Sequence, residues 1–278
     1  MRLIRSVDKI QKIVGQVRKR GKLIGLVPTM GFLHEGHLSL VRIARKKCDF
    51  LVVSVFVNPA QFGPKEDLRR YPRDLKRDLR LLKIEGVDLV FNPSVREMYP
   101  AGFRTYVEVQ EWSRLLCGTS RPAHFRGVTT VVLKLFNILQ PDVAVFGRKD
   151  FQQAVIIQKM VKDLNLGIQV ITGPIVREKD GLAMSSRNIY LSDKDRKNAV
   201  VLYQTLKWVR EAHKNGLRDP GLAISRMRRM IKRKGGRIDY IEMVDKNTLE
   251  PAKKLKKRTL IALAVFFGRT RLIDNIIL

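Results

Sequence analysis

Two histidines, His34 and His37, stand where a phosphate chain could be bound. They follow an apolar run at residues 23–27, which predicts a buried strand, and precede residues 38–45, which have the pattern of a helix. Backbone N–H groups at a helix N-terminus point outwards, and the helix dipole favours anions there. We therefore expect a nucleoside triphosphate site at this junction, with both histidines in contact with phosphate.

A metal pair and a helix cap are the alternatives for these histidines. No carboxylate or cysteine stands at a spacing familiar from zinc sites, and the Glu-x-x-His pattern is absent. A capping role for His34 stays open, but Gly31 and Gly36 would let a phosphate chain come close to the backbone. We predict that His37 donates to the charge that develops on the phosphate during reaction.

Two neutral amides follow the apolar run at residues 51–57. Asn58 and Gln61 lie in the segment that continues this predicted strand. Amides suit a small polar acid, because they form hydrogen bonds to it without adding a charge. The alternative is an ordinary turn, which the pair Asn58-Pro59 forms readily.

A glycine, a lysine and an aspartate follow another predicted strand, at residues 143–146. Gly147 allows close approach of the backbone, and Lys149 can neutralise phosphate charge. Asp150 is placed to cap the next helix or to hold ribose or Mg²⁺. Gln153 lies within that helix, where an ordinary solvated face is the alternative to a binding role.

Residues 184–187, Met-Ser-Ser-Arg, lie in a loop-rich stretch. Two hydroxyls and an arginine on a mobile loop would clamp a triphosphate. The alternative is a serine-rich loop with a surface arginine. His124 lies in the segment at residues 121–128. We expect it to organise a loop near the pocket for the acid and not to act as a catalyst.

The order of these motifs resembles that of the pantothenate synthetase family, one of the nucleotidyltransferase families with a His-x-Gly-His signature. The resemblance is carried by Pro-Thr-Met-Gly at residues 28–31, His-Glu-Gly-His at 34–37, Val-Asn-Pro-Ala-Gln-Phe at 57–62, Phe-Gly-Arg-Lys-Asp-Phe-Gln-Gln at 146–153 and Met-Ser-Ser-Arg-Asn at 184–188. Residues 121–128 and 268–275 are also similar, so the resemblance spans almost the whole chain. The chain has Phe151 where members of the family more often carry tyrosine.

The resemblance implies an AMP-forming acid–amine ligase that condenses (R)-pantoate with β-alanine. Pantoate would attack ATP to give pantoyl adenylate and pyrophosphate, and β-alanine would then give pantothenate and AMP, with Mg²⁺ accompanying the nucleotide. The catalytic residues implied are His34, His37 and Lys149, and Asn58, Gln61 and Gln153 would bind pantoate and β-alanine. The implied ATP contacts are Met30, Gly31, Phe32, Leu33, His34, Glu35, Gly36, His37, Gly147, Arg148, Lys149, Asp150, Val176, Met184, Ser185, Ser186 and Arg187. No side chain is identified as a metal ligand.

Two other functions remain as hypotheses. A nucleotidyltransferase acting on a phosphorylated small molecule would have similar ATP motifs, but its acceptor pocket should be cationic, whereas Gln61 and Gln153 are neutral. The formal net charge of +29 invites an RNA-binding function. No RNA-binding aromatic signature accompanies the basic runs, so we expect a solvated basic surface and no specific nucleic-acid partner.

The composition is typical of a globular enzyme. The chain has 278 residues, 45% of them hydrophobic, and no apolar run reaches the length of a membrane span. Its first residues lack the apolar stretch of a signal peptide, and Cys48 and Cys117 form no disulfide framework. We expect a cytoplasmic, homodimeric enzyme that does not bind membranes.

Alternating strands and helices must position these motifs. Strands are predicted at residues 23–27, 51–57, 87–91, 143–146 and 168–171, and helices at 7–20, 38–45, 71–84, 128–139 and 151–164. This pattern predicts an α/β fold with a Rossmann-like, doubly wound parallel sheet over residues 1–175, with ligands beyond the carboxyl ends of its strands. A helix at 192–215, capped by Ser192, and strands at 237–244 and 259–267 predict a smaller α+β domain at 176–278 that closes over the nucleotide.

Overall fold

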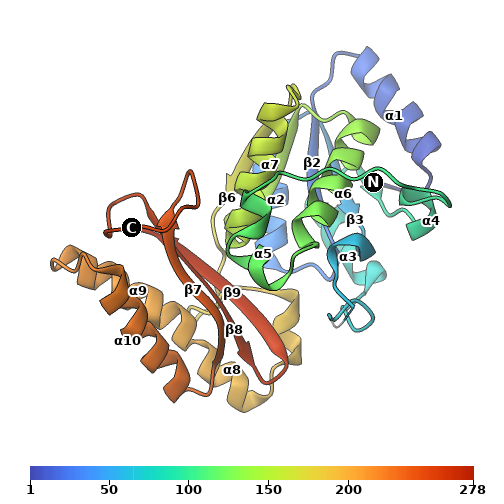
Figure 1. Ribbon diagram of the computed structural model, residues 1–278. Coiled ribbons are helices and arrows are strands. Elements are labelled where there is room, and N and C mark those ends of the chain that lie inside the picture. Colours follow the sequence, from blue (N-terminus) through green and yellow to red (C-terminus); the bar gives the residue numbers. More distant parts are fainter. Residues whose placement is uncertain (65) are drawn as a thin grey trace.

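The computed structural model describes residues 1–64 and 66–278 and contains two β-sheets, which Figure 1 shows in separate lobes. The first sheet is parallel, with the strand order β1-β4-β3-β2-β5-β6, and the second is antiparallel, with the order β7-β8-β9. The strands are β1 (Arg2–Ile4), β2 (Ile24–Thr29), β3 (Phe50–Val55), β4 (Leu89–Phe91), β5 (Val143–Gly147), β6 (Gln169–Gly173), β7 (Arg237–Asp245), β8 (Thr259–Phe267) and β9 (Thr270–Ile277).

Helices connect the strands and cover both faces of the first sheet. The α-helices are α1 (Val7–Lys19), α2 (Glu35–Arg45), α3 (Leu75–Ile84), α4 (Val95–Met98), α5 (Cys117–Ser120), α6 (His124–Leu139), α7 (Phe151–Asp163), α8 (Asp193–Ala199), α9 (Val201–Lys214) and α10 (Pro220–Arg233). Short 3₁₀ turns occur at η1 (Pro59–Gln61), η2 (Trp112–Arg114), η3 (Arg148–Asp150) and η4 (Ser186–Tyr190). The predicted doubly wound parallel sheet is confirmed.

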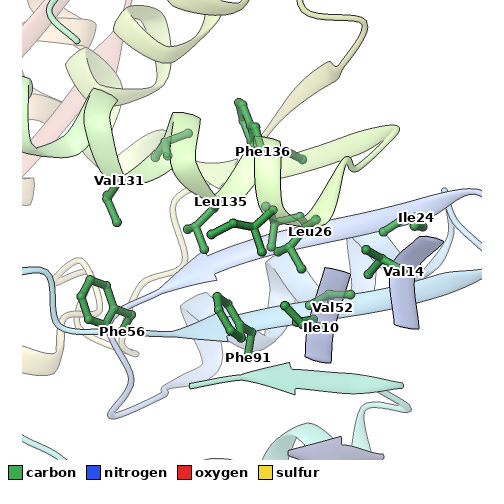
Figure 2. Packing of buried hydrophobic residues seen from close by; sticks show 14 of the residues in the cluster. Ile10, Val14, Ile24, Leu26, Val52, Phe56, Phe91, Val131, Leu135 and Phe136 are labelled. Atoms are coloured by element: carbon green, nitrogen blue, oxygen red, sulfur yellow. The ribbon is translucent and has the colours of Figure 1, made fainter. Parts of the chain in front are cut away.

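Adjacent residues of the central strands pack on opposite faces of this sheet. Leu26 and Val52 lie in the cluster formed with α1, α6 and α7, part of which is shown in Figure 2. Their neighbours Val27 and Val53 lie in the cluster formed with α2 and α3 on the other face. Because both faces are covered, the strands are apolar at nearly every position, as is typical of parallel sheets.

The strand order changes direction between β2 and β5. From β2 the chain continues to β3 and β4 on one side, whereas β5 leads to β6 on the other side. In doubly wound sheets, ligands bind outside the carboxyl ends of the strands at such a switch point. The segments that follow β2 and β5 contain His34 and Lys149 respectively, so the fold brings both residues to this point.

The middle strand of the second sheet, β8, is apolar on both faces, and the sheet lies between its own helices and the first lobe. Ile261 and Leu263 of β8 pack with α9 and α10, whereas Leu260 and Ala262 pack with Leu116 on the other face. Side chains of α7 join this second cluster. The face of the second sheet that carries Leu260 and Ala262 therefore packs against the first lobe, on the side of the carboxyl ends of the parallel strands. The domain boundary at residue 176 stays a prediction.

The differences from the predicted elements have local causes. The predicted helix at 192–215 is two helices, α8 and α9, which meet at Val200. The helix predicted from residue 71 begins at Leu75, because Asp74 caps it by accepting the N–H of Arg77 at 2.9 Å. The predicted strands are all present, whereas β1 and β9 were not predicted. Within residues 1–64 and 66–278, no helix has the length and apolarity that crossing a membrane requires.

Candidate active site

The two histidines of the first motif cap the same helix. His34 is the N-cap of α2, and its Nδ1 accepts the backbone N–H of Gly36 at 3.1 Å. In return, Nδ1 of His37 accepts the N–H of His34 at 3.3 Å, and the ring centroids are 4.1 Å apart. This reciprocal arrangement is that of a capping box, with two imidazoles in the usual places of a hydroxyl and a carboxylate. The capping alternative for His34 is thus present in the structure.

Capping fixes the tautomer of both rings. Because each Nδ1 accepts a hydrogen bond, each neutral ring carries its proton on Nε2. Burial lowers the pKa of His34 to about 4, with smaller contributions from Lys149 and Arg77. Burial and the neighbouring His34 also hold the pKa of His37 well below its ordinary value. At neutral pH both residues therefore offer an Nε2–H donor, and both line a cavity of about 190 Å³.

The lowered pKa of His34 makes the stability of the protein depend on pH. Its pKa is about 4 in the folded protein against 6.5 for the ordinary residue, so the unfolded chain binds more protons between these values. We expect the free energy of unfolding to fall as the pH drops through this window, with a Tm decrease of about 2–4 °C for each kcal/mol lost. Thermal unfolding of the wild type and of His34→Asn, whose side chain can still cap α2, measures this effect. An equally steep pH dependence in His34→Asn would contradict it.

A buried carboxylate that was not predicted holds the loop before α2. Asp78 of α3 accepts the N–H of Phe32 and the N–H of Leu33, each at 2.8 Å. Gly31 has φ +83° and Phe32 has φ 50°, so the loop occupies a region that most residues avoid. Two charge-assisted hydrogen bonds offset this cost. Asp78 lies in a helix rich in basic residues, and nothing in its sequence context sets it apart from a surface aspartate.

Four residues of the segment at 30–37 line the cavity of about 190 Å³, namely Met30, His34, Gly36 and His37, and Met30 also lines a neighbouring cavity of about 570 Å³. Other side chains of the segment lie elsewhere. Leu33 is buried in the core between α2 and the sheet, and the carboxylate of Glu35 pairs with Arg42 on the surface. Any contact of these last two residues with a nucleotide would therefore use their backbone.

Lys149 lies in the turn between β5 and α7 and lines both cavities. Burial lowers its pKa, while the neighbouring Asp150 acts in the opposite direction. Asp150 is the N-cap of α7, but its side chain makes no capping hydrogen bond. Its carboxylate also lines both cavities and is available to a ligand. The side chain of Arg148 is exposed.

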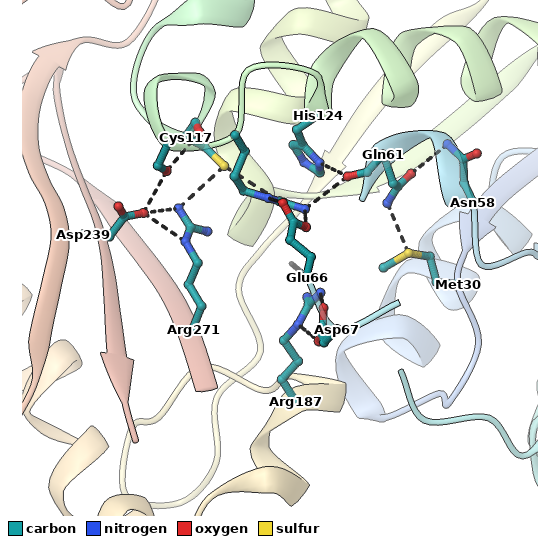
Figure 3. A network of polar contacts seen from close by, with 12 residues as sticks. Met30, Asn58, Gln61, Glu66, Asp67, Cys117, His124, Arg187, Asp239 and Arg271 are labelled. Carbon is teal, nitrogen blue, oxygen red and sulfur yellow. Dashed lines mark hydrogen bonds and ion pairs between the residues drawn. The ribbon is translucent and has the colours of Figure 1, made fainter. Parts of the chain in front are cut away.

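Asn58 and Gln61, the two amides that follow β3, lie in different surroundings (Figure 3). Asn58 is only 1% exposed, and its Nδ2 donates to Oε1 of Gln61 at 3.2 Å and to the carbonyl of Gly127 at 3.0 Å. Its Oδ1 accepts from Tyr99 and from Ala60. All four of its hydrogen-bonding positions are thus filled by the protein. Asn58 thus positions Gln61, and because it also borders the smaller cavity, its expected contact with the substrate stays a prediction.

The backbone of Gln61 is held by the segment at 121–128. Its carbonyl accepts hydrogen bonds from Nη2 of Arg121 at 3.2 Å and from His124 at 2.9 Å. Because a carbonyl only accepts, His124 must carry its proton on Nδ1. Burial, with Arg121 nearby, lowers the pKa of His124 to about 3, so the ring is neutral. His124 thus organises the loop of Gln61, as its position in the sequence indicated.

Adjacent glutamines of α7 face in different directions. The buried side chain of Gln152 donates to the carbonyls of Trp112 and Leu115 at 2.9 and 2.7 Å and accepts from the N–H of Cys117. It therefore anchors the loop beneath the second sheet. Gln153 lines both cavities and faces the same space as Gln61.

The loop at 184–187 is attached to the first lobe. Ser186 Oγ donates to the carbonyl of Phe32 at 3.1 Å, and the N–H of Met184 donates to the carbonyl of Val176 at 3.0 Å. Arg187 forms a bidentate ion pair with Asp67, with N–O distances of 2.7 and 2.9 Å (Figure 3). Ser185 and Arg187 line the larger cavity, and Val176 and Met184 the smaller one.

The larger cavity, of about 570 Å³, lies between the strand ends and the second sheet and shares Met30, Gln61 and Gln153 with the smaller one. Three ion pairs surround it: Arg121–Glu66, Arg187–Asp67 and Arg271–Asp239. Apart from position 65, which is not described, the chain has no group of three His, Cys, Asp or Glu residues arranged to hold a metal ion. The arrangement can bind a phosphate chain with neutral donors and a lysine, beside a small acid held by amides.

The chain is similar to known proteins over almost its whole length. Residues 2–277 match the family model described as pantoate–beta-alanine ligase. Pantothenate synthetases from Acetivibrio thermocellus and Thermosipho africanus are 55% and 54% identical to the chain, which they cover completely, and the match takes in 99% and 100% of their own lengths.

Two solved structures resemble the whole chain. The pantothenate synthetase of Thermus thermophilus has a TM-score of 0.94 at 45% identity, with 99% of each chain covered. The pantoate–beta-alanine ligase of Francisella tularensis, complexed with beta-gamma ATP and beta-alanine, has a TM-score of 0.85 at 35% identity, with 100% of this chain and 97% of that chain covered.

Proposed function

The chain belongs to the pantoate–β-alanine ligase family, and we propose that it condenses pantoate with β-alanine at the expense of ATP. One observation supports this most directly. Two neutral Nε2–H donors and Lys149 meet at the switch point of the sheet, beside the uncharged Gln61 and Gln153. Cationic and dipolar groups there suit phosphate, and the amides suit a small hydroxy acid.

The first step is the transfer of an adenylyl group. A carboxylate oxygen of pantoate attacks the α-phosphorus of ATP, the bond to the β-phosphate oxygen breaks, and pyrophosphate leaves with that electron pair. Negative charge grows on the phosphate oxygens, and Nε2–H of His37, Nε2–H of His34 and the Lys149 ammonium stabilise it. Because the histidines are neutral, they act as hydrogen-bond donors and keep their protons.

The second step forms the amide bond. The free amine of β-alanine attacks the acyl carbon of pantoyl adenylate, the C–O bond to phosphate breaks, and AMP leaves. The amine nitrogen releases its extra proton to solvent. The protein holds the reactants in line and keeps water away from the mixed anhydride, so no covalent enzyme intermediate is needed.

The nucleotide is assigned to the switch point between β2 and β5. Val176 and Met184 would contact the base, while Gly147, Lys149 and the segment at 30–37 would surround the phosphates. Arg187 is paired with Asp67, and we propose that the triphosphate competes for this guanidinium as the loop at 184–187 closes. Ser185 and Ser186 would add hydroxyl donors.

Mg²⁺ is proposed to accompany ATP, because Mg²⁺ is commonly held by one or two carboxylates together with phosphate oxygens. The Asp150 carboxylate fits this requirement, since it lines both cavities and forms no capping bond. The ion would shield the charge of the departing pyrophosphate. We further propose that the enzyme works as a cytoplasmic homodimer without a specific nucleic-acid partner.

Isotope transfer tests the proposed function. Pantoate labelled with ¹⁸O in its carboxylate is incubated with ATP, β-alanine and the enzyme, and AMP and pantothenate are analysed by mass spectrometry. The acyl-adenylate route predicts one labelled oxygen in AMP. Label confined to pantothenate, or retained on the protein, would contradict this route.

Gln153→Ala is expected to raise the KM for pantoate about tenfold with little change in the KM for ATP, because loss of a hydrogen bond of about 1–1.5 kcal/mol has this effect. Initial-rate measurements with each substrate varied in turn test the expectation. Gln158→Ala, which removes an exposed amide from the same helix, is the matched control and should change neither constant. An equal rise in the KM for ATP would move Gln153 into the nucleotide site.

A further inference from the structure

A strand of the second lobe holds the backbone of the Lys149 turn. Asn275 lies on β9 and is only 4% exposed. Its Nδ2 donates to the carbonyl of Arg148 at 3.0 Å and to the carbonyl of Lys149 at 2.8 Å. An amide nitrogen has two hydrogens, so both are used by this one turn.

The turn has no side-chain cap of its own. Neither Gly147 before the 3₁₀ turn nor Asp150 before α7 makes a side-chain capping hydrogen bond. Turns at the start of a helix are usually fixed by such bonds. Asn275 does not supply such a cap, but from more than 120 residues away along the chain it holds two carbonyls of the turn.

The residue before Asn275 supports a second part of the nucleotide site. Asp274 accepts two hydrogen bonds from Arg177, at 2.6 and 2.9 Å, and is 2% exposed. Arg177 directly follows Val176, whose carbonyl accepts the N–H of Met184. Adjacent residues of β9 therefore set the Lys149 turn and the segment of Val176 relative to each other.

We propose that Asn275 is a positioning residue for adenylyl transfer, acting through the backbone of Lys149. The inference rests on the proposed function, in which the Lys149 ammonium meets the triphosphate. When Asn275 is lost, two carbonyls lose their buried donor and the turn can shift. A displacement of about 1 Å can reduce the rate of a positioned reaction about 10²-fold.

Measuring the two half-reactions separately distinguishes a positioning role of Asn275 from general damage to the fold. Adenylyl transfer is measured as pantoate-dependent exchange of labelled pyrophosphate into ATP, and amide formation as the reaction of supplied pantoyl adenylate with β-alanine. Asn275→Ala is expected to slow the exchange about 10²-fold and to leave amide formation unchanged. Asn275→Ser keeps one hydroxyl donor and should lose less, which also provides a milder variant if Asn275→Ala folds poorly.

Two controls complete the experiment. Thr205→Val removes a buried hydrogen bond to the carbonyl of Leu202, 2.8 Å long, in α9 of the same lobe, and should lower the Tm without changing either half-reaction. Adding Asn275→Ala to Lys149→Met should slow the exchange no further, because both substitutions act on the same contact between the Lys149 ammonium and the triphosphate. Full exchange in Asn275→Ala, or equal losses in both half-reactions, would overturn the inference. Absence of exchange in the wild type would instead refute the proposed function.

Discussion

His37→Gln is expected to slow pantoate-dependent pyrophosphate release about 10²–10³-fold, the usual effect of removing one donor to a developing charge. The Tm should hardly change. Glutamine is a preferred residue at the third position of a helix, where its side chain accepts the N–H of the capping residue, as Nδ1 of His37 does here. The substitution thus keeps the cap acceptor and removes the imidazole Nε2–H; glutamine still carries an amide N–H₂, so the expected loss requires that this flexible donor does not take the place of the ring N–H.

His34→Asn applies the same logic to the other ring. Asparagine is a good N-cap, so α2 should keep its stability while ATP use weakens. His213→Gln, in α9 of the second lobe, is the matched control and should retain full activity. Pyrophosphate release and thermal unfolding are measured together at pH 7.5. Full activity in His37→Gln would mean that the reaction does not require an imidazole at position 37.

The parallel sheet could be predicted because its strands are buried on both faces. Runs such as Leu51 to Val53 are apolar and rich in β-branched residues, and several of them are followed by a motif of polar residues. Since ligands bind at the carboxyl ends of such strands, the same pattern indicated where His34, Gln61 and Lys149 would converge. Fold and family were therefore accessible from the sequence.

The supporting residues could not be predicted, because their partners are distant in the sequence. β9 includes Arg271, Asp274 and Asn275, so it lacks the apolar pattern of a strand. Its polar side chains face partners in Arg177 and in the Lys149 turn, which only the folded chain brings near. Asp78 is similar, because its partners are backbone N–H groups of a loop that precedes it by about 45 residues.

Asn58 shows a different limit. Residue type and position after a strand indicated contact with a small acid, and both amides satisfied that pattern equally. Their difference lies in burial and pairing, because Asn58 is 1% exposed and bonded to Tyr99 and Gly127 and borders only the smaller cavity, whereas Gln61 lines both cavities. Sequence position identified the pair, but only the folded structure shows that the polar groups of Asn58 are already paired within the protein.

Lys149→Met is expected to lower kcat/KM for ATP on the order of 10²–10³-fold while raising the Tm. Burial lowers the pKa of Lys149, which means that folding disfavours its charged form. Methionine has a similar length and no charge, so it removes this cost and fills the same space. Activity and stability should therefore change in opposite directions, as they do where a site keeps a buried charge for function.

The opposite signs make the experiment decisive. Lys162→Met removes an exposed lysine from the last turn of α7, at the end of the helix away from Lys149, and should change neither kcat/KM nor the Tm. If Lys149→Met lowered the Tm as well as the activity, Lys149 would be a structural residue and the loss of rate would follow from a damaged fold. If both values stayed at those of the wild type, the triphosphate would not depend on this ammonium. A higher Tm with a much slower adenylyl transfer requires a lysine held in the cavity, at a cost in stability, for the charge of the phosphates.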